Sequence, residues 1–257
     1  CTQDTLSANY NDLESAETLF TQFGKEIAAV IVEPVGANMG VVPPKKEFLE
    51  GLRKLCTKHG ALLIFDEVNT GFRLGIDGAQ GYYGVQPDLT TFGKIIGAGM
   101  PVGAYGGKKE IMRCVSPVGN VYQAGTLSGN PVAMAAGITQ LTILRDHPEI
   151  YKELNEKGDW FFKEMEKAVR DSKKQWQGNH VGSLGCIFFT DQPVTDYASA
   201  KTSDTARFAN YFQYMLDHCI HLGPSQFEAM FLSAAHTEEE LQKTLDIIRE
   251  YMETEER

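Results

Sequence analysis

Apolar residues in the first half of the chain form short continuous runs. These runs lie at 27–34 (IAAVIVEP), 61–68 (ALLIFDEV), 88–93 and 102–107. Runs of this length that are rich in β-branched residues predict strands, and the first two have the composition of strands buried on both faces. The first half therefore holds at least four predicted strands.

A helix is predicted between the first two runs, over about 46–59. Pro43 and Pro44 precede it, Gly60 follows it, and its apolar positions recur at helical spacing: Phe48, Leu49, Leu52 and Leu55. Strands that alternate with helices in this way predict an α/β architecture with a mostly parallel sheet. Ligands of such sheets bind at the carboxyl ends of the strands.

The second half of the chain has a different pattern. Helical periodicity occurs at 129–145, 149–170, 203–219 and 237–253, and strand-like runs at 181–190 and 228–235. Thr237 and Glu240 have the spacing of a capping box at the start of the last helix. Two domains are therefore predicted, a larger one over 1–148 and a small C-terminal α+β domain over 149–257.

Composition narrows the function classes. The 257 residues include 24 basic and 34 acidic side chains, a formal net charge of −10, which disfavours a general nucleic-acid or anionic-membrane binder. No apolar run approaches the length of a membrane span and no signal-peptide pattern opens the chain, so a cytoplasmic protein is expected. The chain begins at Cys1 rather than a methionine, which suggests that an N-terminal part is absent.

The cysteines give no sign of a disulfide framework or a metal site. There are five, widely spread, without a C-x-x-C pair and without histidines at metal-binding spacing: Cys1, Cys56, Cys114, Cys186 and Cys219. Reduced thiols in the cytoplasm are the simple interpretation. No bound metal is predicted.

Lys94 is the first candidate for chemistry. It is the only charged residue in LTTFGKIIGAGMPVG (89–103), a run of apolar residues and glycines. Most lysines in such a setting reach the surface with the amine, and the segment alone favours that interpretation. A desolvated lysine, by contrast, loses its proton readily and becomes an amine nucleophile.

Asp66 and Glu67 are the second candidate, directly after four apolar residues of the predicted strand 61–68. A strand-end acid commonly caps the following turn. The functional alternative is a carboxylate that pairs with a cation such as a protonated pyridine nitrogen. Lys94 follows the next predicted strand, so the two strand ends would place a carboxylate and an amine at opposite sides of one ring.

Several motifs together resemble the class III pyridoxal-phosphate aminotransferases. They are DEVNTGFR (66–73), PDLTTFGKIIGAGMPVGAYGG (87–107) and VYQAGTLSGNPVAMAAG (121–137), supported by EPVGANMGVVPP (33–44), GAQGYYGVQPDL (78–89) and PSQFEAMFLSAAHTEEE (224–240). The similarity runs nearly the whole length, in order. It implies a fold-type I pyridoxal-phosphate-dependent transferase, incomplete at its N-terminus, with 1–148 as the C-terminal part of the large cofactor-binding domain.

The resemblance also implies residue roles. Lys94 is similar to the lysine that holds pyridoxal 5'-phosphate and moves protons, Asp66 to the partner of the pyridine nitrogen, and Val68 to the side chain packed on the ring. Thr126, next to Gly125, is similar to a threonine that reaches the cofactor phosphate of the neighbouring subunit. Without the resemblance, Thr126 and Ser128 would be read as caps of the helix at 129–145.

Two further acids follow from the same resemblance. Glu228 is similar to a substrate-facing glutamate of the aminomutases in this family, and Glu33 to a strand-end acid near the site without a specified role. The implied reaction is an internal amine shift that converts glutamate 1-semialdehyde to 5-aminolevulinate for tetrapyrroles, with pyridoxamine 5'-phosphate in the cycle. A homodimer with shared active sites is implied, with no nucleic-acid or membrane partner.

Several positions depart from the family pattern. Asn69 stands where the aminomutases usually have methionine and many class III aminotransferases have glutamine, which leaves room for transaminase specificity. HCIHLGPSQ (218–226) also differs from the usual glycine, aromatic and alanine pattern. The family's phosphate-cradling Ser-Gly-Thr segment and its ring-stacking aromatic residue have no counterpart in the chain.

Two alternatives stay open. An ω-amino-acid transaminase would use the same residues with a second amino donor, and a non-catalytic fragment could merely fold or dimerise. A dinucleotide-binding module is suggested by GAGMPVG (97–103), but the required glycine is replaced by Val102, and Pro101 opposes a helix start there. No G-x-x-x-x-G-K-[ST] run exists, so a P-loop is excluded.

Overall fold

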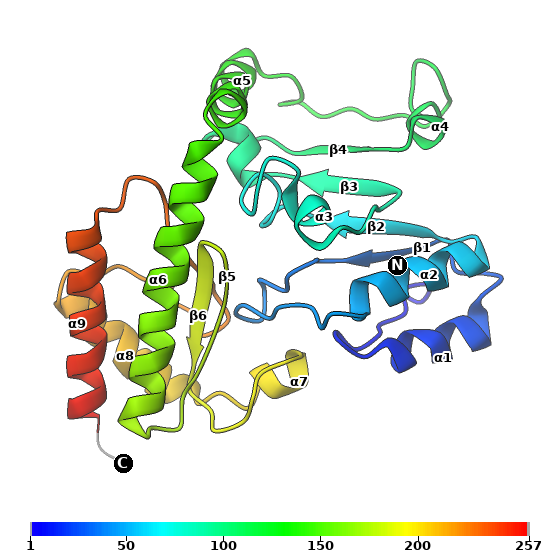
Figure 1. Ribbon diagram of the computed structural model, residues 1–257. Coiled ribbons are helices and arrows are strands. Elements are labelled where there is room, and N and C mark those ends of the chain that lie inside the picture. The colour runs from blue at the N-terminus through cyan, green and yellow to red at the C-terminus, as the bar shows by residue number, and fades with distance from the viewer. Residues whose placement is uncertain (1, 256–257) are drawn as a thin grey trace. The chain divides into compact units, whose positions relative to one another are not determined.

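The computed structural model describes residues 2–255 and divides into two compact units (Figure 1). The first unit comprises Cys1–Pro34 and Lys45–Pro148, and the second comprises Val35–Pro44 and Glu149–Arg257. Cys1, one of the five predicted thiols, lies outside the described residues, and the other four are free.

The first unit contains a sheet of four strands in the order β1-β2-β3-β4. The strands are β1 (Ala29–Val32), β2 (Leu62–Asp66), β3 (Leu89–Phe92) and β4 (Ala104–Gly107). β1, β2 and β3 are parallel, whereas β4 pairs with β3 in the antiparallel direction. The expected α/β architecture with a mostly parallel sheet is confirmed.

Helices precede, connect and follow these strands. They are α1 (Leu13–Phe23), α2 (Phe48–His59), α3 (Gly78–Tyr83), a 3-10 turn η1 (Lys94–Gly97), α4 (Lys109–Met112) and α5 (Pro131–Asp146). α1 and α2 lie side by side (Figure 1) and bury their apolar faces with β2 in one core, which includes Phe20, Leu49, Leu52, Cys56, Leu63 and Phe65. α2 ends at Gly60, whose φ of 74° suits a left-handed helix C-terminus.

One expectation for this sheet is wrong. β1 was expected to be buried on both faces, but its residues alternate between exposed and half-buried, and Ile31 is 63% exposed. β1 is an edge strand of the described sheet, so only one neighbouring strand flanks it. α1, α3 and α4 have no counterpart among the predicted elements.

The second unit packs helices on a three-stranded antiparallel sheet. Its elements are α6 (Glu149–Ser172), β5 (Gln177–Val181), β6 (Leu184–Phe188), α7 (Tyr197–Ala200), α8 (Thr205–Asp217), β7 (Met230–Phe231) and α9 (Glu238–Thr254). Its core is rich in aromatic side chains and includes Phe161, Phe162, Trp176, Phe189, Tyr211 and Tyr251. The predicted capping box of Thr237 and Glu240 is confirmed at the start of α9.

Two strand predictions in this unit needed correction. The run at 181–190 is one strand of a hairpin rather than a single element, because the chain turns at Gly182 (φ 55°) and β5 pairs antiparallel with β6. The run at 228–235 forms only the two-residue strand β7. None of the helices described between residues 2 and 255 is long and apolar enough to cross a membrane.

The segment Val35–Pro44 packs with the second unit although it follows β1 in sequence. The N–H of Gly40 donates to the carbonyl of Phe227 at 2.9 Å, and the N–H of Val41 donates to the Cys186 sulfur at 3.0 Å. Burial raises the pKa of the Cys186 thiol to about 12. This thiol therefore acts as a structural side chain.

Asp88 joins α2, β2 and β4 at the amino end of β3. Its carboxylate accepts from the Leu63 N–H and Arg53, both at 2.7 Å, and pairs with Lys108 at 2.5 Å. Burial alone would raise the pKa of Asp88, but the hydrogen bonds from Lys108, Leu63 and Arg53 lower it to about 2. The carboxylate thus holds the end of the sheet opposite the strand ends where ligands bind.

We expect the stability of the first unit to depend on pH through Asp88. Because the pKa is lower in the folded state, the stabilisation is complete above about pH 4 and is lost as pH falls towards 2. Asp88→Asn should cost about 2 kcal/mol of unfolding free energy at neutral pH. Urea unfolding between pH 2 and 7 measures this, and a wild-type advantage that stays constant down to pH 2 would contradict it.

Candidate functional site

Two candidate residues meet at the carboxyl ends of β2 and β3. Asp66 is the last residue of β2 and lies opposite Thr91 of the parallel β3, and the Glu67 N–H extends the ladder to the Thr91 carbonyl at 3.0 Å. Lys94 follows β3 after a single residue, Gly93. The structure therefore places the carboxylate and the amine on neighbouring strand ends at one edge of the sheet.

The backbone at Lys94 bends sharply. Its φ of 49° lies in the left-handed region, which a residue with a side chain adopts at a cost of about 1 kcal/mol, and Ala98 at the end of the same turn has the same φ. Helix α5 supports the bend, because a Cβ at Gly137 would collide with the carbonyl oxygen of Ile96. The close approach of α5 holds the lysine-bearing turn in place.

The Lys94 amine donates a hydrogen bond to the side-chain oxygen of Asn69. Asn69 is only 8% exposed, whereas Lys94 is an exposed residue of the described chain. One interpretation of the sequence required Lys94 to be enclosed by its apolar neighbours. Within residues 2–255 Lys94 is exposed instead, and its amine contacts the side-chain oxygen of the buried Asn69.

The Asp66 carboxylate is half-buried, and one of its two oxygens accepts a hydrogen bond within the protein. Its Oδ1 accepts the N–H of Val68 at 3.0 Å, while its Oδ2 accepts no hydrogen bond from the residues that the structure describes. The Val68 side chain lies beside Gly93, where a Cβ would be 3.2 Å from its Cγ1. Asp66, Val68 and Lys94 therefore surround one stretch of the sheet edge.

Glu67 has the structural role that was considered for both acids. It is fully buried and accepts from the Ala79 N–H at 2.5 Å, the Thr70 hydroxyl at 3.1 Å, and the backbone and side-chain N–H groups of Gln80 at 3.2 Å. These donors include the first turn of α3. Gly78 gives it room, since a Cβ there would collide with the carboxylate.

The loop with Gly125 and Thr126 is exposed and precedes α5. The expectation that Thr126 and Ser128 cap this helix is wrong, because Asn130 is the N-cap and accepts from the N–H groups of Val132 and Ala133, both at 3.1 Å. Within the described part of the chain the Thr126 hydroxyl makes no hydrogen bond, so it is available to an anion.

The two remaining candidate acids lie in different units. Glu33 directly follows β1, and because β1 is parallel to β2 it lies at the same sheet edge as Asp66. Glu228 belongs to the second unit and is exposed just before β7. Gln226 was not among the predicted residues; it is buried and anchors this loop to β6 by donating to the Ile187 carbonyl at 2.7 Å.

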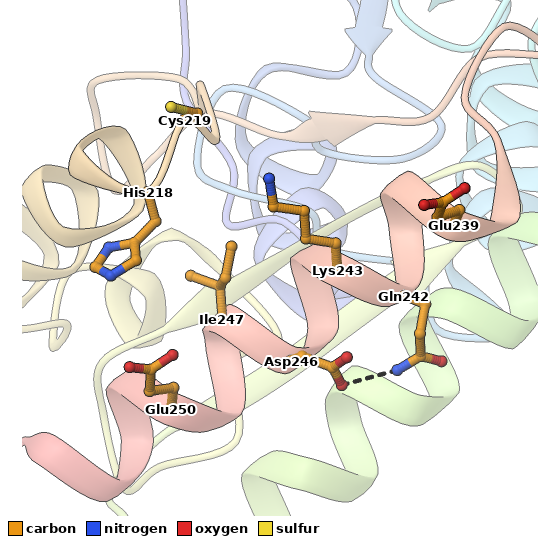
Figure 2. Close-up of a pocket in the computed structure, with 8 residues that line it drawn as sticks. All are labelled: His218, Cys219, Glu239, Gln242, Lys243, Asp246, Ile247 and Glu250. Carbon is orange, nitrogen blue, oxygen red and sulfur yellow. Dashed lines mark hydrogen bonds between the residues drawn. The ribbon is translucent and has the colours of Figure 1, made fainter.

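A groove of about 590 Å³ lies elsewhere in the second unit, between α9 and the end of α8 (Figure 2). Figure 2 shows its side chains, which are His218, Cys219, Glu239, Gln242, Lys243, Asp246, Ile247 and Glu250. The one hydrogen bond drawn joins Gln242 to Asp246 at 2.8 Å within α9. None of the candidate residues lines this groove.

The donor groups at the sheet edge fit an organic cofactor. An amine for covalent attachment, a carboxylate oxygen open to a protonated ring nitrogen and the apolar side chain of Val68 at the same sheet edge are groups that suit a pyridine aldehyde. Among residues 2–255, no group of three or more His, Cys, Asp or Glu side chains could hold a metal ion.

We expect Glu67→Gln to lower the free energy of unfolding by about 2–4 kcal/mol, because an amide turns one acceptor into a donor that faces N–H groups. Asp66→Asn is the matched control, since its one contact within the protein keeps an oxygen acceptor and should cost less than about 1 kcal/mol. Urea unfolding of both variants is the measurement. Equal losses for the two would contradict this division of roles.

Comparison with known proteins gives the family. The model of the Aminotransferase class-III family matches residues 2–251. Glutamate-1-semialdehyde 2,1-aminomutase 1 of Lachnoclostridium phytofermentans is 64% identical over 254 residues, which are 99% of this chain and 60% of the relative. The aminomutase of Acetivibrio thermocellus is 58% identical over 95% of this chain and 56% of its own length. The chain therefore spans about three fifths of the relatives it matches.

Solved structures agree on the fold. The β-phenylalanine aminotransferase of Variovorax paradoxus is 31% identical with a TM-score of 0.87, and it is matched over 95% of this chain and 56% of its own. A structure described as a transaminase with PLP bound has 29% identity and a TM-score of 0.84 over 95% of this chain and 56% of its own. The expected fold-type I transferase architecture is confirmed, and the chain belongs to the class-III aminotransferase family.

Proposed function

We propose that this chain is the lysine-bearing part of a pyridoxal-phosphate-dependent aminomutase. The whole protein converts glutamate 1-semialdehyde to 5-aminolevulinate, a precursor of tetrapyrroles, by moving an amino group within one molecule. The observation that supports this most is the placement of Lys94 and Asp66 on adjacent parallel strand ends. Relatives 58–64% identical over nearly the whole chain are named for this reaction.

The cofactor, when bound, supplies a ring that accepts the electrons released when a proton leaves the substrate carbon. Lys94 would hold the cofactor covalently, and its amine, once released, would move protons. The second oxygen of Asp66 would pair with the ring nitrogen and keep it protonated, because a nearby negative charge favours the charged form. Val68 would supply an apolar contact to the ring.

Other residues bind the ends of the ligands. The open hydroxyl of Thr126 and the backbone beside Gly125 bind the cofactor phosphate of the neighbouring subunit. Glu228 faces the substrate, and the buried Gln226 holds its loop on β6. The first unit is the C-terminal part of the cofactor-binding domain and the second is the small domain. The unpaired Cys56, Cys114, Cys186 and Cys219 suit a reducing cytoplasm.

An ω-amino-acid transaminase is the second candidate. Asn69 favours it, because an amide at this position is closer to the glutamine of many class III aminotransferases than to methionine. Solved structures about 31% identical include a β-phenylalanine aminotransferase and an ω-transaminase. The two functions differ in one requirement, since a transaminase needs a separate amino donor and the aminomutase does not.

We expect Lys94→Ala in the whole protein to abolish covalent attachment of pyridoxal phosphate. Attachment is followed by the absorbance of the bound cofactor and by mass spectrometry after borohydride reduction. Lys54→Ala is the control, because Lys54 is exposed on α2, pairs only weakly with Glu50 at 3.6 Å and should leave attachment intact.

Substrate assays complete this test. With glutamate 1-semialdehyde as the sole amine, the wild-type protein should form 5-aminolevulinate without another amino donor, and Asp66→Asn should lose at least about a hundredfold in kcat while keeping its fold. Attachment that survives Lys94→Ala would refute the site. Turnover that depends on an added donor would establish the transaminase instead.

We expect the whole protein to be a homodimer in which Thr126 serves the partner's cofactor. The loop before α5 exposes apolar side chains that a partner would cover, among them Val121, Leu127 and Tyr122, which is 82% exposed. Light scattering gives the assembly, and a mixture of inactive Lys94→Ala with inactive Thr126→Ala should regain activity through mixed dimers. A monomer, or a mixture without recovery, would contradict the shared site.

A further inference from the structure

Asn69 brings a buried amide to the lysine at the sheet edge. It is 8% exposed, and its Oδ1 accepts the hydrogen bond from the Lys94 amine. A buried side-chain amide requires partners, because an unsatisfied polar group costs about 1–3 kcal/mol. The hydrogen bond therefore satisfies the buried Asn69 oxygen and gives the Lys94 amine a fixed acceptor.

The backbone that carries Asn69 is fixed on both sides. The Gly71 N–H donates to the Glu67 carbonyl at 2.8 Å, and the Thr70 hydroxyl donates to the Glu67 carboxylate at 3.1 Å. Glu67 itself is tied to β3 through the Thr91 carbonyl at 3.0 Å. The Asn69 oxygen is consequently held in a defined place instead of sampling many positions.

The lysine is fixed at its other end. Its backbone occupies the left-handed region with φ of 49°, in a turn that α5 supports at Gly137. A long lysine side chain otherwise has many rotamers, and ordering it costs up to about 2 kcal/mol. The fixed backbone of Lys94 and the fixed acceptor oxygen of Asn69 together reduce the positions that the amine can adopt.

We propose that Asn69 is a positioning residue for Lys94, whose side-chain oxygen holds the amine in a fixed place at the strand ends until the cofactor takes it. This rests on the proposed role of Lys94. A hydrogen bond donated by a charged group is stronger than one between neutral groups, so it can hold the end of a flexible side chain. The asparagine oxygen supplies such a bond, and an apolar side chain of the same size does not.

The test measures the reactivity of the Lys94 amine in the chain without cofactor. Acetic anhydride acetylates only the unprotonated amine, and peptide mass spectrometry reports Lys94 and the exposed Lys54 in the same sample. Wild type is compared with Asn69→Leu, which removes the acceptor at similar size, and with Asn69→Asp, which keeps an oxygen there and adds charge. Labelling rates are taken from pH 7 to 11.

Asn69→Leu should label Lys94 about tenfold faster than wild type, because the amine no longer donates to a fixed acceptor. Asn69→Asp should label Lys94 more slowly than wild type, because a carboxylate accepts a stronger hydrogen bond from the amine. The Lys54 profile should stay the same in all three proteins. Because Lys94 is already exposed, easier access of the reagent would not explain opposite shifts.

Unchanged Lys94 profiles in both variants, or shifts in the same direction, would overturn the proposal. A lower melting temperature of Asn69→Leu without a change in profile would show that Asn69 has a structural role only. The proposed function is tested separately, by attachment of the cofactor to Lys94 in the whole protein. Opposite shifts of the labelling profile without attachment would support the positioning role of Asn69 and refute the aminomutase. Attachment with unchanged profiles would support the aminomutase and refute the positioning role.

Discussion

The parallel pairing of β2 with β3 is the constraint on which the candidate site depends. Parallel strands end at the same edge of a sheet, so a residue that closes one strand and a residue that follows the next are brought together although 27 residues separate them in sequence. A shift of one residue in this register would turn Asp66 and its neighbours to the opposite face. Asp88 fixes the register from the other end of β3, through the Leu63 backbone.

The adjacent carboxylates of Asp66 and Glu67 have different roles, because Glu67 stabilises the structure and Asp66 is a candidate for chemistry. Glu67 is buried and accepts four hydrogen bonds, three of them from α3 and one from Thr70, whereas Asp66 keeps an oxygen without a partner among the described residues. The alternation of side chains about a strand explains the difference, because consecutive residues point to opposite faces. A rigid neighbour is what allows Asp66 and Asn69 to present oxygens in fixed places.

The sequence predicted the strand and helix pattern well where periodicity and glycine were informative, as for β2, α2 with Gly60, and α9 with its capping box. It could not show that β1 is an edge strand or that Gly182 turns a hairpin, because both depend on which strands pair. Asn69 was recognised only as a departure from a pattern. Its contact with Lys94 depends on a left-handed backbone at a lysine, which no local preference predicts.

Each unit fixes its own candidate groups with buried contacts that do not take part in chemistry. In the first unit, Gly137 lets α5 approach the turn that bears Lys94. In the second unit, Gln226 ties the loop before Glu228 to β6, and the carbonyl of Phe227 receives the N–H of Gly40 from the segment that follows β1. The candidate groups are thus placed precisely by close packing of the residues next to them. Adding a methyl group or changing an amide among those packed residues would displace the candidate groups.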